Sequence, residues 1–163
     1  MHLKQSNLIL TGSLLGFLLL GGSCRPEQER YTLSSPDGDI TLYCHVSPDS
    51  MAYYRVEYRG SEVLRSSGLG LERSDADFSC GLVLDSVSEP RTLHETYHLV
   101  SGKIQEVGHT SNRMALHLLN RDELRMDIVF RVFDDGVALR YVFPGTSEDP
   151  LQIESESTAF HFP

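Results

Sequence analysis

The chain has 163 residues, of which 40% are hydrophobic and 23% are charged, and its formal net charge is −9 at pH 7. This length and composition are typical of one globular domain and exclude a chain that is disordered throughout. The acidic balance argues against a nucleic-acid-binding protein, because such a domain would repel phosphate groups.

The first 23 residues are predicted to be an export signal and not part of the fold. Lys4 lies in a short basic region, and the segment that follows it, from Leu8 to Leu20, is almost wholly apolar. That segment has 13 residues, whereas a helix that spans a bilayer needs about 20. The pattern therefore predicts a signal peptide over residues 1–23.

A lipid anchor is predicted at Cys24. The small residues at 21–23 stand directly before this cysteine, as in a bacterial lipobox, where the cysteine is acylated and becomes the mature N-terminus. The leucine usual three places earlier is Gly21 here, so ordinary cleavage with a free cysteine is the alternative. Two or more acyl chains would anchor the protein stably. We expect a lipidated tether over residues 24–30 and a periplasmic or outer-membrane lipoprotein of a Gram-negative bacterium.

From Tyr31 onward the dominant hydrophobic period is two, which predicts β-strands. Segments of about seven residues, a typical strand length, alternate apolar and polar side chains. They lie at 40–46, 54–59, 114–118, 126–132 and 137–143. In the second of them, Tyr54, Val56 and Tyr58 form the apolar set.

Turn signals separate these segments. They are SPDGD at 35–39, VSPDS at 46–50, NRDE at 120–123 and DDG at 134–136. The Asp-Gly pair in the last of them favours the positive φ of a tight hairpin. Residues 72–91 are the least regular and are expected to include a long loop. Short strands joined by such turns predict an all-β fold, an antiparallel β-sandwich.

Two cysteines lie within the predicted sandwich, Cys44 and Cys80. An exported protein permits a disulfide between them. Cys44 alternates with Leu42 and Val46, however, which places it on the inward face of a strand, where a buried free thiol is common. The sequence leaves both interpretations open.

The segment His94 to His98, HETYH, matches the H-E-x-x-H signature of zinc peptidases. That chemistry needs a helix, in which residues four apart face the same way and are close enough to share one ion. On a strand the two histidines would lie roughly 13 Å apart, at about 3.3 Å per residue. Alternation through Glu95 and Tyr97 favours a half-exposed strand, although a helical face through Tyr97 and Val100 could also be drawn. A zinc site on His94, Glu95 and His98 is the weaker interpretation.

Other candidate site residues are few. Glu154 and Glu156 have strand spacing and could share a face, as in glycoside chemistry or calcium binding, but a solvated strand face is the simpler interpretation. Aromatic rings can stack on sugars, and four tyrosines are candidates for this role. Tyr54 and Tyr141 fall on inward faces, which leaves Tyr53 and Tyr97 as candidate sugar contacts. We predict no catalytic residue and no metal ligand in this chain.

The ordered motifs of the chain resemble the start of the N-terminal domain of glycoside hydrolase family 97. The matching stretches are Ser35-Pro36-Asp37-Gly38, Tyr54, Val56, Tyr58 with Gly60, Val63-Leu64, Leu69-Gly70-Leu71, Glu95-Thr96-Tyr97, Gly102-Lys103, Glu106-Val107, Asn112, and the run from Phe130-Arg131 through Asp135-Gly136-Val137-Ala138 to Arg140-Tyr141 and Phe143-Pro144. Phe160, Phe162 and Pro163 resemble the next strand of that family, which would be an edge strand here. The family usually has Trp at the position of Tyr97.

The resemblance implies a β-super-sandwich related to galactose-mutarotase-like domains. It also implies that this domain is not the catalytic one. It implies an exported calcium-dependent α-glucosidase or α-galactosidase that acts on α-linked glycans, with its catalytic carboxylates on a C-terminal (β/α)₈ barrel of the same polypeptide. The carboxylate that this domain lends to the calcium site is expected beyond Pro163. The sandwich is expected to be incomplete, because the domain of the family is considerably longer. The alternative is a stand-alone surface lipoprotein that binds a glycan or a protein partner.

Overall fold

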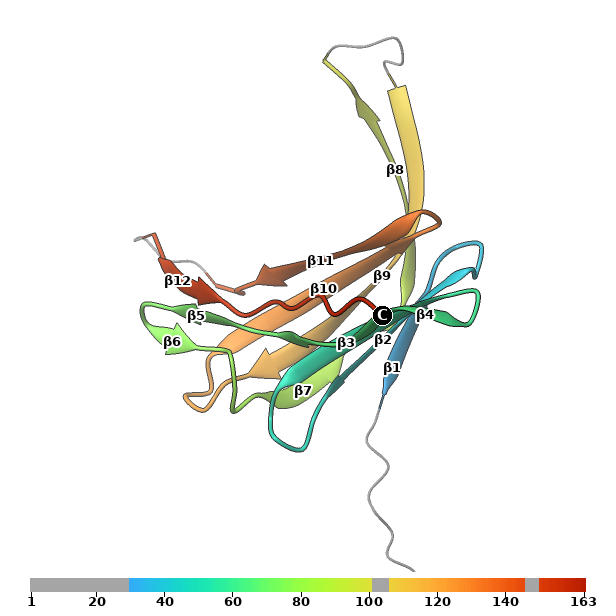
Figure 1. The fold of residues 1–163 in the computed structure, drawn as a ribbon. Helices are drawn as coiled ribbons and strands as arrows, with labels where there is room; N and C mark the ends of the chain where they lie inside the picture. The colour runs from blue at the N-terminus through green and yellow to red at the C-terminus, as the bar shows by residue number, and fades with distance from the viewer. Residues whose placement is uncertain (1–29, 101–105, 146–149) are drawn as a thin grey trace, which may run out of the picture.

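The computed structural model describes residues 30–100, 106–145 and 150–163, and every regular element in these ranges is a β-strand (Figure 1). The predicted signal peptide, Cys24 and all but the last residue of the predicted tether lie outside the described residues. The described part of the chain contains no helix with the length and apolar character needed to cross a bilayer.

The first sheet is an antiparallel meander with the strand order β1-β2-β3-β4. Its strands are β1 (Tyr31–Ser34), β2 (Ile40–Val46), β3 (Ala52–Tyr58) and β4 (Ser61–Leu69). The predicted turn between β1 and β2 is present, and Gly38 has a φ of 83° there. Ser35 stabilises this turn, because its hydroxyl accepts a hydrogen bond from the Ile40 N–H at 3.0 Å.

The second sheet has the order β11-β10-β9-β7. Its strands are β7 (Val83–Val87), β9 (Glu106–Leu119), β10 (Arg125–Phe133) and β11 (Gly136–Val142). An additional strand, β8 (Arg91–His98), pairs with the first half of β9 and forms an arm that projects from the sandwich (Figure 1). A small third sheet joins β12 (Ile153–Glu156), β5 (Leu71–Arg73) and β6 (Ala76–Asp77) in the order β12-β5-β6.

The hydrophobic core lies between the two larger sheets and follows the period of two. In both sheets, the side chains that the alternation places inward are buried. They include Leu42, Cys44, Tyr54, Val56, Met114, Leu116, Leu118, Met126, Ile128, Phe130 and Val132. The predicted all-β antiparallel sandwich is confirmed.

Two local predictions were wrong. Residues 72–91 hold most of β5 and all of β6 and β7 instead of one long loop, because β5 pairs both with its neighbour β6 and with the distant strand β12. The predicted hairpin between β10 and β11 is present, but Gly136 is not one of its turn residues. The chain turns through Asp134 and Asp135, since Gly136 already pairs with Phe133. Gly136 is not among the residues with positive φ. Instead, Asp134 Oδ1 accepts a hydrogen bond from the Asp37 N–H at 3.0 Å, which fixes the turn to the first sheet.

Both cysteines of the sandwich are free thiols, so the disulfide does not form. Cys44 is buried in the core and Cys80 is half-buried. Burial raises the pKa of Cys44 to about 12.

We expect native protein to react with a thiol reagent at Cys80 and not at Cys44. At mildly alkaline pH the Cys44 thiol stays protonated and enclosed, and only the thiolate is nucleophilic. Peptide mass spectrometry after alkylation with iodoacetamide would locate the label, and unfolding in denaturant should make both sites react. Rapid labelling of Cys44 in the native protein would contradict its placement in the core.

Candidate functional site, a groove between two sheet edges

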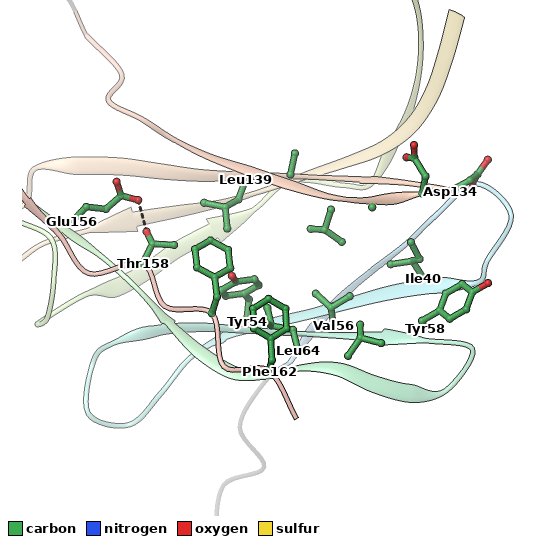
Figure 2. A pocket seen from close by; sticks show the side chains of 16 residues that line it. Ile40, Tyr54, Val56, Tyr58, Leu64, Asp134, Leu139, Glu156, Thr158 and Phe162 are labelled. Atoms are coloured by element: carbon green, nitrogen blue, oxygen red, sulfur yellow. Dashed lines mark hydrogen bonds between the residues drawn. The ribbon is translucent and has the colours of Figure 1, made fainter.

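An apolar groove of about 830 Å³ lies between β4, at the edge of the first sheet, and β11, at the edge of the second (Figure 2). The first sheet contributes apolar side chains from β2, β3 and β4, and β11 contributes Val137, Ala138 and Leu139. Val137 and Leu139 face inward and pack against the core, whereas Ala138 lies between them on the outer face of β11. The groove is therefore a part of the core that the two sheets leave uncovered.

The opposite side of the sandwich is joined differently. There the Asn112 side chain of β9 donates a hydrogen bond from Nδ2 to the backbone oxygen of Ser34 on β1, at 2.8 Å. On the groove side, β11 pairs only with β10 among the described strands. The backbone of β11 therefore presents a sheet edge to whatever occupies this side.

The C-terminal segment lies along the other wall of the groove. Ser157 and Ala159 donate backbone hydrogen bonds to Gly70 and Gly68, both at 2.9 Å, and Arg65 donates to His161 at 2.8 Å. An edge strand was predicted around Phe160. Residues 157–163 do run along β4, but they are not a regular strand.

Two tyrosines fix this segment across the groove. Tyr54 donates a hydrogen bond from its hydroxyl to the Ala159 carbonyl at 3.1 Å, and burial raises the pKa of Tyr54 to about 12, so it remains a donor. The Tyr141 hydroxyl accepts from the Gly70 N–H at 3.0 Å and lies 2.7 Å from Thr158 Oγ1. Side chains of β3 and β11 therefore hold one segment between two sheets.

Large apolar side chains remain exposed in this groove. Phe160 meets the Tyr54 ring edge-on, with a centroid distance of 6.4 Å, yet it is 59% exposed, and Phe162 is 70% exposed. The only charged side chains in the described lining are the carboxylates of Asp134, Asp135 and Glu156. A lining of this kind can bind polypeptide, but it offers no nucleophile paired with a base.

The candidate sugar contacts are not brought together. Tyr53 lies on the outer face of the first sheet, where its ring stacks on His45 at a centroid distance of 5.7 Å. Tyr97 lies on the arm in the second sheet, with its ring edge-on to His109 at 5.6 Å. The two tyrosines are in different sheets and do not form one binding site.

The zinc interpretation of HETYH is wrong, because the segment forms strand β8. His94 lies 3.0 Å from Thr110 Oγ1 on the neighbouring strand. Glu95 instead accepts hydrogen bonds from Arg131 at 2.5 Å and from His109 at 3.0 Å, and these partners lower the pKa of its carboxyl. Sequence analysis missed this network, since its members come from three strands.

No group of three or more His, Cys, Asp or Glu side chains in the described ranges could hold a metal ion. Glu154 and Glu156 are both exposed on β12, without a third ligand beside them. The described residues therefore do not fit a calcium site, and we assign no calcium-dependent step to this chain.

Comparison with known proteins gives consistent matches. The profile of the family described as Glycosyl-hydrolase 97 N-terminal matches residues 33–163. A probable retaining alpha-galactosidase of Streptomyces bingchenggensis (strain BCW-1) is 31% identical over 159 residues, which cover 96% of this chain and 24% of that protein.

Solved structures match the same region. A beta-arabinopyranosidase superposes with a TM-score of 0.74 and 28% identity, over 82% of this chain and 21% of that one. A glycoside hydrolase family 97 enzyme from Pseudoalteromonas sp. strain K8, in complex with panose, has a TM-score of 0.70 and 24% identity, over 81% and 20% of the two chains. The chain thus spans about a quarter of the first relative and about a fifth of these structures.

Proposed function

Because the chain belongs to the Glycosyl-hydrolase 97 N-terminal family, we propose that it is the non-catalytic sandwich that supports the catalytic barrel of an exported, calcium-dependent α-glycosidase. The resemblance inferred from the sequence is confirmed by the family match and by the curated relative. The activity, the calcium and the glycan substrate belong to the proposal.

The groove between β4 and β11 carries this proposal. Its apolar walls and the exposed rings of Phe160 and Phe162 are unfavourable in water, at about 25 cal/mol for each Å² of apolar surface. Further polypeptide of a longer enzyme could cover them, and it could also pair with the edge of β11. This feature favours a domain of a larger protein over the stand-alone lipoprotein, which would leave the groove in contact with solvent.

Export and glycan contact are further parts of the proposal. They rest on the apolar segment from Leu8 to Leu20, on Cys24, and on the exposure of the Tyr97 ring on the arm. Tyr53 is the weaker candidate for sugar stacking, because its ring already stacks on His45.

We expect the purified chain to have no glycosidase activity. Asp134 and Glu156 lie at opposite ends of the groove (Figure 2), whereas the two carboxylates of a glycosidase flank one glycosidic bond. Release of p-nitrophenol from p-nitrophenyl α-glucoside and α-galactoside should equal the blank, with or without added calcium. Calcium-dependent release by this chain alone would contradict the supporting role.

A further inference from the structure

Four arginines gather on the outer face of the second sheet, although the chain is acidic, with a net charge of −9. Arg91 on β8 pairs with Arg113 on β9, and Arg113 pairs with Arg131 on β10. Residues directly opposite each other in antiparallel strands point to the same face. The neighbours Met114 and Phe130 face the core, so the arginines face away from it. Arg140, on β11, pairs with Val129 of the same outer face.

This arrangement is unfavourable for the protein alone. Side chains directly opposite each other have Cβ atoms about 5 Å apart, and like charges in that position destabilise a sheet. Among the described residues, Arg131 alone of the four has a counter-charge, the Glu95 carboxylate at 2.5 Å. No ion pair joins Arg91, Arg113 or Arg140 to a carboxylate in the part of the chain that the structure describes. A row of cations that does not stabilise the fold suggests a ligand of opposite charge.

Three of these arginines, all except Arg91, line a cavity of about 280 Å³. Arg113, Arg131 and Arg140 contribute three positive charges to its lining and Glu95 one negative charge, and Leu93 and Ala138 provide apolar surface. Arg131 is fixed in place, since it also donates to Ser111 Oγ at 3.1 and 2.7 Å. A water molecule occupies about 30 Å³, so the cavity has room for a sugar-sized group beside a bound anion.

We propose that this face of the second sheet is an oxyanion-binding site, which we call the arginine face (Arg91, Arg113, Arg131 and Arg140). Planar guanidinium groups donate paired hydrogen bonds to carboxylate, sulfate or phosphate oxygens. Arg113 and Arg140 bind the anion, and Arg131, held by Glu95 and Ser111, sets the shape of the cavity. The apolar surface of Leu93 and Ala138 suits an anion carried on a sugar ring, so a uronate sugar is the ligand class we expect to bind best.

Titration of the full chain would test the site. Inorganic sulfate, inorganic phosphate and glucuronate would be titrated separately by calorimetry at constant ionic strength, with glucose as the neutral control. All three anions should bind and glucose should not. Tighter binding of glucuronate than of sulfate identifies an anionic sugar as the ligand, and equal binding identifies a free anion. Absence of binding by every anion would overturn the proposal.

Variants make the test specific. The double variant Arg113→Gln/Arg140→Gln should bind each anion at least about tenfold more weakly, because it removes two charge-assisted donors. Arg59→Gln is the matched control, since Arg59 is an exposed arginine in the turn between β3 and β4 that forms an ion pair with Asp39 at 2.7 Å. Equal loss of binding in Arg59→Gln and in the double variant would show non-specific attraction and overturn the site.

A stability measurement separates a binding role from a structural one. Arg113→Gln removes the central charge of the row, so its melting temperature at low ionic strength should be equal to or above that of the unsubstituted chain. Added sulfate should raise the melting temperature of the unsubstituted chain more than that of Arg113→Gln, as binding to the folded state requires. A lower melting temperature for Arg113→Gln, together with unchanged anion binding, would show that Arg113 serves the fold and would overturn the proposal.

Discussion

Replacing Phe130 by alanine should lower the free energy of unfolding by about 3–5 kcal/mol, the usual cost of emptying a buried phenylalanine site. Phe130 is 0% exposed, lies in the middle of β10, and contacts the Tyr54 ring of the first sheet at a centroid distance of 6.4 Å. Domains of this size have about 5–15 kcal/mol of stability in total, so the variant would lose much of it. Urea denaturation followed by circular dichroism would measure the change.

Phe162→Ala is the matched control for this prediction. It removes the same side chain from a position that is 70% exposed, where substitutions usually change stability by about 0.5 kcal/mol or less. Phe162 should matter for covering the groove and not for the core of the isolated chain. Similar losses in Phe130→Ala and Phe162→Ala would mean that the core does not lie between the two sheets.

The period of two was enough to predict much of this core. Leu42, Tyr54 and Phe130 were placed inward by alternation alone, and all three are buried. Tyr58 follows the same alternation, yet it is 42% exposed. It lies at the end of β3 and lines the groove. Alternation assigns a face to a side chain, but whether another layer covers that face depends on where the sheet ends.

Contacts between distant strands were beyond sequence reasoning. The network of Glu95, His109 and Arg131 needs the register of β8, β9 and β10, and a shift by one residue would turn each side chain to the other face. The arginine face depends on the same registers. HETYH shows the converse, since local alternation already favoured a half-exposed strand over the zinc interpretation, and the segment forms the exposed strand β8.

The pairing of β5 with β12 has the same cause. Neither strand is long or strongly patterned, and the two strands are separated by about half the length of the chain. Each is short enough that the hydrogen bonds of its partner, and not its own propensity, make it a strand. The link between β4 and β5 is therefore a place where long-range packing can be tested.

Gly70→Ala should destabilise the protein by about 1–3 kcal/mol or more, the cost of overfilling a packed site. Gly70 lies between β4 and β5, and an added Cβ would be 2.8 Å from the Ser79 Cα and 2.9 Å from the Ser157 Oγ. The first contact is with backbone, so the chain around Ser79 would have to move. Gly70 also accepts the hydrogen bond from the Ser157 N–H and donates to Tyr141. The C-terminal segment should therefore detach from β4 more often.

Gly136→Ala provides the comparison, because it makes the same chemical change where no atom lies within 4 Å of the added Cβ. Gly136 does not have a positive φ, so alanine should be neutral there or stabilising by up to about 1 kcal/mol, through the lower entropy of the unfolded chain. Thermal melts would give both stabilities, and limited proteolysis would report release of the C-terminal segment. If Gly70→Ala melted like Gly136→Ala and resisted proteolysis equally, the segment would not be held between β4 and β11, and the groove would lack one of its walls.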